Sequence, residues 1–448
     1  MKTIMYGGCD PLVIKKLDEN LDIKCKIHSI ENLDKDYSNL GLVRDNFNKE
    51  PLLDVEARKI YQDFYNKNFV KFNTMIVRRG ILLSDFHDLR DEFSLYFYSF
   101  YEILKKNKIE LAIFFSFPHE GPDYILYKLA KYFKIKTILF YQTIFKERFF
   151  ILSDLSEFGK IKKNIESGNY HYLLNDDQSY IKTVNDKNQK NRKNSESFIY
   201  NFKKSRRKIR FLLLKILIFL KIVNRRDRQK EYLENLKKIQ VSNEYLDKIF
   251  KNGKKKIYFP LHFQPELTTS LLANNDDQPL ILERLSQFAG DEWDIIVKEN
   301  PKQTYYQRGK FFFKRLKYFK NVYFVDKFYS SAELVKQTDL VATNCGTPGW
   351  ESIKSGKKTL VFGTSWFSDI HGCLKVNNQT TDDEIKKFIQ QEFDPSKFSS
   401  DFNNLMSQSC HGLIDLYYKE FYGIKNFDEK RNAEKIINHI LKYLEKLN

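Results

Sequence analysis

The stretch IELAIFFSFPHEGPDYILYKLAKYFKIKTILFYQT, residues 109–143, decides the fold. It opens with a continuous apolar run, residues 109–117, which is typical of a parallel strand that is buried on both faces. A polar turn follows, and after it come a segment with helical spacing and another apolar run, residues 136–143. Strand, turn, helix and strand in this order form a βαβ unit and predict a parallel sheet.

The second half of the chain repeats this alternation of apolar runs and helical patterns. Strands are expected at residues 254–263, 293–301, 321–326, 339–344 and 358–363. Helices are expected between them at residues 279–290, 331–338 and 349–356. Such alternation predicts a second doubly wound α/β domain.

The length of 448 residues also favours two domains over one. We predict an N-terminal Rossmann-like domain (1–205), a helical basic connector (206–250), a second Rossmann-like domain (251–425) and a C-terminal amphipathic helix (426–448). No internal repeat of solenoid period is evident.

The formal net charge is +18, which favours anionic partners such as nucleotides or phospholipid surfaces. A biased genome rich in lysine and asparagine explains the same charge without a partner. The five cysteines are scattered and contain no Cys-x-x-Cys pair, and the N-terminus lacks the apolar core of a signal peptide. These features predict a cytoplasmic protein without a structural zinc site.

The segment KIRFLLLKILIFLKIVNRR, residues 208–226, combines apolar residues with flanking lysines and arginines. Its apolar part would form a helix of roughly 20 Å, too short to cross a bilayer. The basic flanks favour a helix that lies on an anionic inner membrane. The alternative is a buried connector helix whose lysines reach outward to water.

Ligands of doubly wound sheets bind beyond the carboxyl ends of the strands, so the polar residues there are the candidate site. His119 and Glu120 follow the strand of residues 109–117 and are candidates for acid–base chemistry. The alternative is a capped helix start, because carboxylates stabilise helix N-termini. His262 and Gln264 follow the next strand, in the sequence FPLHFQPE.

Lys298 ends a third strand in VKENP, where a lysine can pair with a phosphate. The turn TNCGTPGWE places Asn344, Gly346 and Thr347 before a helix and Glu351 in its first turn. A helix N-terminus binds phosphate through its backbone N–H groups. Glu351 would repel phosphate but can accept hydrogen bonds from a ribose diol, so the two features together predict a nucleotide-sugar site. The alternative is an acid that only stabilises its helix.

At these positions the sequence resembles a known family. KIYFPLHFQPE, VKENP and TNCGTPGWESIKSGKKTLVFG resemble the capsular polysaccharide biosynthesis family of bacteria, which includes Kdo transferases. The resemblance covers roughly residues 254 to 375. It implies a metal-independent GT-B glycosyltransferase without a cofactor, in which two Rossmann-like domains face each other across a cleft.

The resemblance also implies roles for the candidate residues. His262, Gln264, Lys298, Asn300, Asn344, Gly346, Thr347 and Glu351 would contact a nucleotide sugar, with a CMP-sugar such as CMP-Kdo favoured. Glu120 and His119 would be the catalytic residues, and the acceptor would be a glycan or glycolipid. The chain has Lys298-Glu299-Asn300-Pro301 where relatives often have Lys-x-His-Pro, and asparagine carries no charge toward a phosphate.

Two other functions fit part of the pattern. A non-catalytic polysaccharide-assembly or export protein could use the same fold and retain the site residues. A nucleic-acid protein is suggested by charge alone, and the basic residues form no recognised nucleic-acid module. We therefore expect a glycosyltransferase at the inner face of the membrane, with no nucleic-acid partner.

Overall fold

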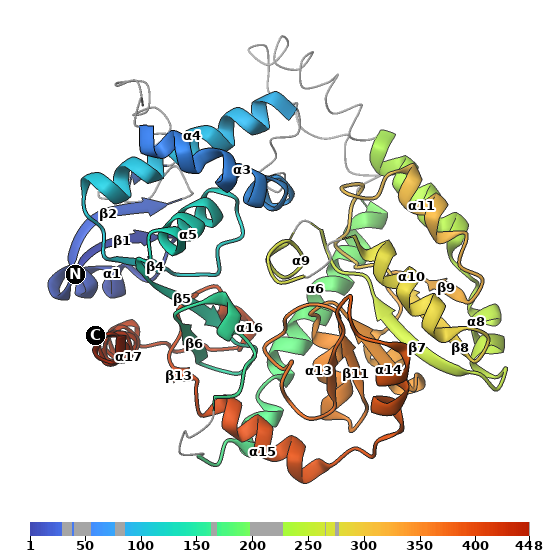
Figure 1. The fold of residues 1–448 in the computed structure, drawn as a ribbon. Coiled ribbons are helices and arrows are strands. Elements are labelled where there is room, and N and C mark those ends of the chain that lie inside the picture. Colours follow the sequence, from blue (N-terminus) through green and yellow to red (C-terminus); the bar gives the residue numbers. More distant parts are fainter. Residues whose placement is uncertain are drawn as a thin grey trace. The chain divides into compact units, whose positions relative to one another are not determined.

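The computed structural model describes residues 1–28, 38–39, 55–76, 86–162, 168–197, 227–264, 266–273 and 277–447. These residues form two compact units (Figure 1). The first unit contains Met1–Ile181, Pro265–Leu271 and Ser400–Asn448, and the second contains Lys182–Gln264 and Leu272–Ser399.

The described part of the first unit contains a seven-stranded sheet in the order β13-β6-β5-β4-β1-β2-β3. Its strands are β1 (Lys2–Tyr6), β2 (Asp22–His28), β3 (Ser38–Asn39), β4 (Leu111–Phe114), β5 (Lys136–Gln142), β6 (Arg148–Leu152) and β13 (Cys410–His411). The strands from β3 to β5 are parallel, while β6 and β13 run antiparallel to their neighbours. The order of the chain reverses between β1 and β4, which is the switch point of this sheet.

Helices cover both faces of this sheet. The helices of the unit are α1 (Pro11–Asn20), α3 (Val55–Ile76), α4 (Phe86–Lys106), α5 (Pro122–Tyr132), α9 (Leu267–Ser270), α16 (Tyr418–Phe421) and α17 (Glu429–Leu447). Short 3-10 turns, η3 (Leu155–Glu157) and η4 (His171–Asn175), follow β6. Buried side chains of α1 and α17 share one core with β1, β4 and β5. On the other face, the ring of Tyr127 in α5 meets that of Phe114 in β4.

The second unit has a six-stranded sheet among its described residues, in the order β12-β11-β10-β7-β8-β9. Its strands are β7 (Lys255–Pro260), β8 (Trp293–Lys298), β9 (Val322–Val325), β10 (Leu340–Thr343), β11 (Thr359–Val361) and β12 (Cys373–Lys375). All five neighbouring pairs are parallel. This order is that of a dinucleotide-binding Rossmann sheet, with its switch point between β7 and β10.

Alternate residues of β7 explain why helices lie on both faces of the second sheet. Its helices are α8 (Asn243–Phe250), α10 (Gln278–Ala289), α11 (Lys310–Leu316), α12 (Ser331–Gln337), α13 (Thr347–Lys354) and α14 (Asp382–Gln390). Ile257 and Phe259 pack in a core with buried residues of α10. Tyr258, between them, packs in a second core with α8 and α12. Residues that alternate along a strand point to opposite faces, so a continuous apolar run needs two layers of helices.

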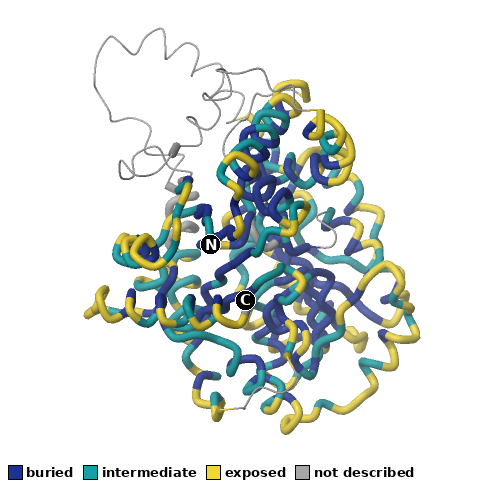
Figure 2. The backbone as a smooth tube through the Cα atoms, turned by 60° about the vertical axis from the view of Figure 1, so that its left-hand side comes forward, coloured by how far each residue is buried: buried dark blue, intermediate teal, exposed yellow. Residues whose placement is uncertain are grey.

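Two helices cross from one unit to the other. The polar helix α6 (Gln178–Ser197) enters the second unit at Lys182, and α15 (Pro395–Met406) enters the first unit at Ser400. Residues 227–239 are also helical. Figure 2 shows buried residues concentrated in the strands and on the inner sides of the helices.

The predicted fold class, two α/β domains with Rossmann-like sheets, is confirmed. The predicted boundaries at residues 205, 250 and 425 stay a prediction, although contacts group residues 400–448 with the N-terminal domain. The reason is burial: Ile436 and Ile440 of α17 are fully buried in the core of the first sheet. The cleft between domains stays a prediction.

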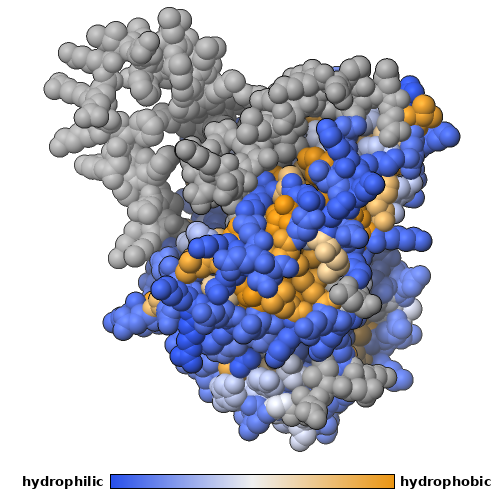
Figure 3. Space-filling model, turned by 90° about the vertical axis from the view of Figure 1, so that its left-hand side faces the viewer, coloured by the Kyte–Doolittle hydropathy of each residue, from blue (hydrophilic) through white to orange (hydrophobic). Residues whose placement is uncertain are grey.

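The segment predicted to touch the membrane, residues 208–226, lies outside the described residues. In the part of the chain that is described, no helix has the length and apolar character needed to cross a membrane. Figure 3 shows one face on which apolar side chains gather between hydrophilic ones.

Candidate functional site

Three candidate residues of the second unit, His262, Lys298 and Asn344, lie where its parallel strands end. The strand β7 ends at Pro260, two residues before His262, and its neighbours β8 and β10 end at Lys298 and Thr343. Because β7 and β10 flank the switch point, their following loops diverge and leave the carboxyl edge of the sheet open to a ligand. The candidate residues therefore lie at the strand ends where the sequence placed them, and their binding of a ligand stays a prediction.

The imidazole of His262 joins the loops after β7 and β10. Its Nε2 accepts a hydrogen bond from the Cys345 N–H at 3.3 Å and lies 3.3 Å from Thr343 Oγ1. The same hydroxyl accepts from the Gly346 N–H at 2.9 Å. An Nε2 that accepts must be unprotonated, so the ring proton lies on Nδ1.

Burial keeps this histidine neutral. His262 is only 7% exposed, and burial, together with the smaller effect of the positive charge of Arg308, lowers its pKa to about 4. Its protonated form would lose the acceptor that holds Cys345. Since the pKa in an unfolded chain is about 6.5, this residue stabilises the fold fully above that pH. The stabilisation is lost as the pH falls from about 6.5 toward 4.

Position 346 requires glycine because a larger side chain would have no room there, and not because the backbone is strained. Its φ of −85° suits any residue, and it caps the N-terminus of α13. A Cβ at this position would lie 2.8 Å from His262 Nε2 and 3.1 Å from Thr343 Oγ1. The turn before α13 is thus closed tightly around the histidine ring, with Thr347 as the first residue of the helix.

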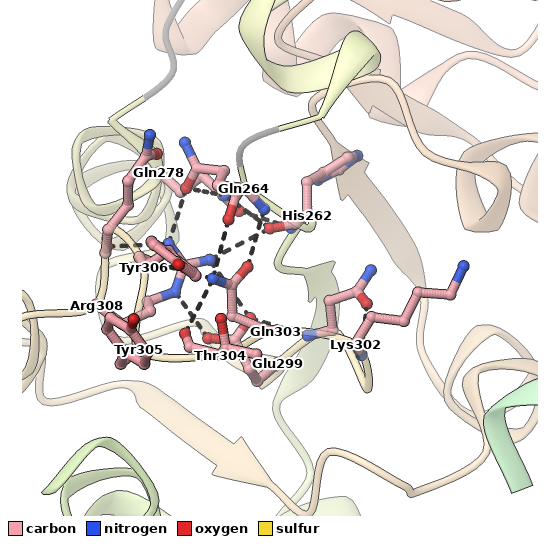
Figure 4. Close-up of polar contacts among 12 residues, drawn as sticks. His262, Gln264, Gln278, Glu299, Lys302, Gln303, Thr304, Tyr305, Tyr306 and Arg308 are labelled. Atoms are coloured by element: carbon pink, nitrogen blue, oxygen red, sulfur yellow. Dashed lines mark hydrogen bonds and ion pairs between the residues drawn. The ribbon is translucent and has the colours of Figure 1, made fainter. Parts of the chain in front are cut away.

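A buried polar network holds the backbone of the β7 loop (Figure 4). Gln278 Oε1 accepts from the His262 N–H at 2.7 Å, and Gln278 Nε2 donates to the His262 carbonyl at 3.0 Å. Gln303 Oε1 accepts from the Gln264 N–H at 2.9 Å, and its Nε2 donates to the Gln264 carbonyl at 3.1 Å. Each of the two glutamine side chains therefore bonds to both the N–H and the carbonyl of one loop residue, as the backbone of a neighbouring strand would.

An ion pair lies in the middle of this network. Arg308 Nε donates to Glu299 Oε2 at 2.8 Å, and the two side chains are 1% and 0% exposed. A buried pair needs further hydrogen bonds to offset its desolvation. Arg308 supplies them to Gln264 Oε1 at 2.8 Å and to the His262 carbonyl at 3.2 Å. The pair thereby connects the loop after β8 with the loop after β7.

Lys298 and Glu351 form the charged side of the site. Burial lowers the pKa of Lys298 to about 8, although the charges of Glu351 and Asp326 act in the opposite direction. Its Nζ donates to the Tyr329 carbonyl at 3.2 Å. Glu351 is half-buried in α13, one turn from its N-terminus. A lysine that is partly neutral near pH 8 becomes fully charged when an anion binds beside it.

Three further candidates have structural contacts in the same unit. Asn344 is fully buried, and its Oδ1 would lie 2.8 Å from a Cβ added to Gly363. Asn300 Oδ1 accepts from the Lys302 N–H at 3.0 Å, which shapes the turn after β8. Gln264 is 4% exposed and belongs to the buried network. These contacts support the shape of the site.

His119 and Glu120 lie in the first unit, in the loop between β4 and α5 at the switch point of that sheet. The carboxylate of Asp123 accepts from their backbone N–H groups at 2.7 and 2.8 Å. The His119 Nδ1 lies 2.6 Å from the Phe117 carbonyl. Burial raises the pKa of Asp123, which is 3% exposed. The loop is therefore wound around the carboxylate of Asp123, the second residue of α5, while the side chains of His119 and Glu120 are half-buried.

Sequence reasoning missed Gln278, Gln303 and Arg308. Gln303 and Arg308 lie in the segment between β8 and α11, and Gln278 begins α10. Arg308 is 46 positions from the His262 carbonyl that it contacts. No spacing rule joins such residues. The described ranges contain no group of three or more His, Cys, Asp or Glu residues that could hold a metal.

We predict that Gly346→Ala lowers the free energy of unfolding by about 1–3 kcal/mol, because the added methyl group overlaps His262 Nε2. Urea denaturation of the second unit measures the change. The matched control is Gly309→Ala, at a φ of −76° with no atom within 4 Å of the new Cβ. We expect that control to stay within about 0.5 kcal/mol of the unsubstituted chain. Equal stability of the two variants would contradict the tight turn.

Comparisons with solved structures give only weak likenesses. Two are Kdo transferases of KpsC from Thermosulfurimonas dismutans. The beta Kdo 2,4 transferase has 10% identity and a TM-score of 0.31, over 68% of this chain and 81% of that one. The beta Kdo 2,7 transferase has 9% identity and a TM-score of 0.34, over 95% and 100% of the two chains.

A third structure is MnaA of S. aureus with UDP, which has 11% identity and a TM-score of 0.28, over 99% of this chain and 97% of that one. Likenesses this weak carry no argument about activity. No curated protein matches the sequence. A model of the family described as Capsule polysaccharide biosynthesis protein matches residues 236–410, which include β7, β8, β10 and the turn before α13. Residues 236–410 are therefore similar to the capsule polysaccharide biosynthesis family, in agreement with the resemblance of the sequence motifs.

Proposed function

We propose that the chain is a glycosyltransferase that transfers a sugar from a nucleotide-activated donor to a capsular or other surface polysaccharide. The observation that carries the proposal is the closed turn at the switch point, where His262 and Thr343 shape the N-terminus of α13. This turn lies within the segment that matches the capsule family. CMP-Kdo or a related CMP-sugar is the donor that we favour, and a glycan or glycolipid is the acceptor.

The turn suits the phosphate of such a donor. The N-terminus of α13 carries a partial positive charge, and Lys298 contributes a full charge when protonated. The Thr347 N–H and hydroxyl are the first groups of the helix that a phosphate would meet. Glu351, one turn further along, would then accept hydrogen bonds from the ribose. Stabilising charge on the leaving phosphate is the main way in which these groups would accelerate transfer.

In the proposed reaction, the acceptor hydroxyl attacks the anomeric carbon of the donor. Its oxygen forms the new glycosidic bond, the bond between the anomeric carbon and the phosphate oxygen breaks, and the nucleotide leaves with the bonding electrons. Glu120 or His119 accepts the hydroxyl proton. The chemistry requires no metal in this scheme, because the dipole of α13 and Lys298 stabilise the leaving group.

A thermal-shift screen with CMP, UDP, GDP and ADP tests the proposal. We expect CMP to raise the melting temperature, because a ligand at 100 times its Kd stabilises the fold by roughly 2.7 kcal/mol. The full chain is used, with and without magnesium. A shift with UDP or GDP instead keeps the glycosyltransferase class and replaces the donor. If no nucleotide gives a shift, the proposed site is wrong and a non-catalytic assembly protein becomes the better interpretation.

The matched variant for this screen is Glu120→Gln in the first unit. We expect it to keep the nucleotide shift and to lose transfer from a CMP-sugar to a polysaccharide acceptor, since glutamine cannot accept the proton. Transfer is followed as release of CMP in the presence of acceptor. Unchanged transfer by this variant would remove Glu120 from the mechanism and leave His119 as the candidate.

We also predict that nucleotide affinity falls as the pH rises through about 8. Lys298 has a pKa of about 8 in the nucleotide-free chain, and a bound phosphate favours its charged form and raises that pKa. Binding at a pH near or above 8 therefore takes up protons, which calorimetry in buffers of different ionisation enthalpy detects. Lys298→Met should lose this uptake, whereas Lys320→Met, an exposed lysine of the same unit, should keep it. Equal proton uptake by both variants would exclude Lys298.

A further inference from the structure

The backbone and the ring of His262 make different hydrogen bonds. Its backbone contacts Gln278 and Arg308, and its imidazole contacts Thr343 and Cys345. Figure 4 shows its peptide group turned toward the Gln278 and Arg308 side chains, while the imidazole points away from Arg308. Gln278 contacts both the N–H and the carbonyl of His262, and Arg308 donates to the same carbonyl. The backbone of His262 is therefore fixed in the position from which its ring contacts Cys345 and Thr343.

The two supports of His262 are themselves linked. Gln264 Oε1 accepts from Gln278 Nε2 at 2.5 Å and from Arg308 Nη1 at 2.8 Å. The guanidinium is fixed in turn by Glu299, and its face lies 4.6 Å from the ring centroid of Phe312. Gln278 is 0% exposed and Arg308 is 3% exposed, so water does not replace a lost contact easily. If Gln278 or Arg308 moves, the buried groups that it contacts lose that hydrogen bond.

We propose that Gln278 and Arg308 are positioning residues of the nucleotide site, acting through the backbone of His262. They place the imidazole so that Nε2 receives the Cys345 N–H and the turn before α13 stays closed. That the turn binds a nucleotide rests on the proposed function. That Gln278 and Arg308 hold the turn in place does not. The nearby charge of Arg308 also lowers the pKa of His262 and so favours the ring with a bare Nε2.

Substituting Gln278 by Met removes both contacts with His262 and keeps the length of the side chain. The matched control is Gln287→Met in the same helix, where the glutamine is exposed. We expect the amides of Cys345 and Gly346 to exchange with solvent deuterium about tenfold faster in the first variant. The amides of Val341 and Ala342 in β10 should be unchanged. A merely structural role would instead accelerate exchange through the whole sheet.

The affinity for CMP and UDP, measured by calorimetry, is the second readout. We expect Gln278→Met to weaken the binding of the nucleotide about tenfold, and Gln287→Met to leave it unchanged. Arg308→Lys, which keeps a charge for Glu299 but loses the fork toward Gln264 and His262, should resemble Gln278→Met. It replaces that variant if Gln278→Met does not fold.

The outcomes separate this inference from the proposed function. Faster exchange confined to Cys345 and Gly346 supports the inference even if neither nucleotide binds the unsubstituted chain, in which case the nucleotide assignment alone fails. Unchanged exchange at these two amides in Gln278→Met or Arg308→Lys overturns the inference, whatever the nucleotide affinity.

Discussion

The hydrogen bond from the Cys345 N–H to the Nε2 of His262 is the constraint on which the second unit depends. It joins the loops after β7 and β10, the two strands that diverge at the switch point of the sheet. It helps to close the sharp turn before α13, and a hydrogen bond of this kind contributes about 0.5–1.5 kcal/mol. Gly346 is small because the ring occupies the space that a side chain would need.

This constraint explains why so many polar side chains are buried next to it. A neutral histidine with a fixed ring requires a fixed backbone, and Gln278 and Arg308 provide it. Arg308 in turn requires Glu299, since an unpaired charge at this depth is strongly unfavourable. In the proposed function, this network would hold the N-terminus of α13 and Lys298 in place for a phosphate.

The sequence predicted the sheets because their strands are continuous apolar runs that alternate with helices. The sequence also placed His262, Lys298 and the turn at Gly346 at the carboxyl ends of parallel strands, where the structure has them, and their binding of a ligand stays a prediction. It could not predict Arg308 or Gln303, which reach the loop from a turn without periodicity. The helix α17 was expected from its apolar stripe, but a stripe does not specify which sheet it covers.

The most direct measurement of the central claim is a nitrogen-15 NMR titration of the His262 ring in the full chain. We predict that the His262 ring has an unprotonated Nε2 and a protonated Nδ1 at neutral pH, and that it titrates near pH 4 rather than near 6.5. A ring that titrates near pH 6.5, or that exchanges between both tautomers at neutral pH, would contradict it. In that case His262 would not hold the turn, and the shape proposed for the nucleotide site would fail with it.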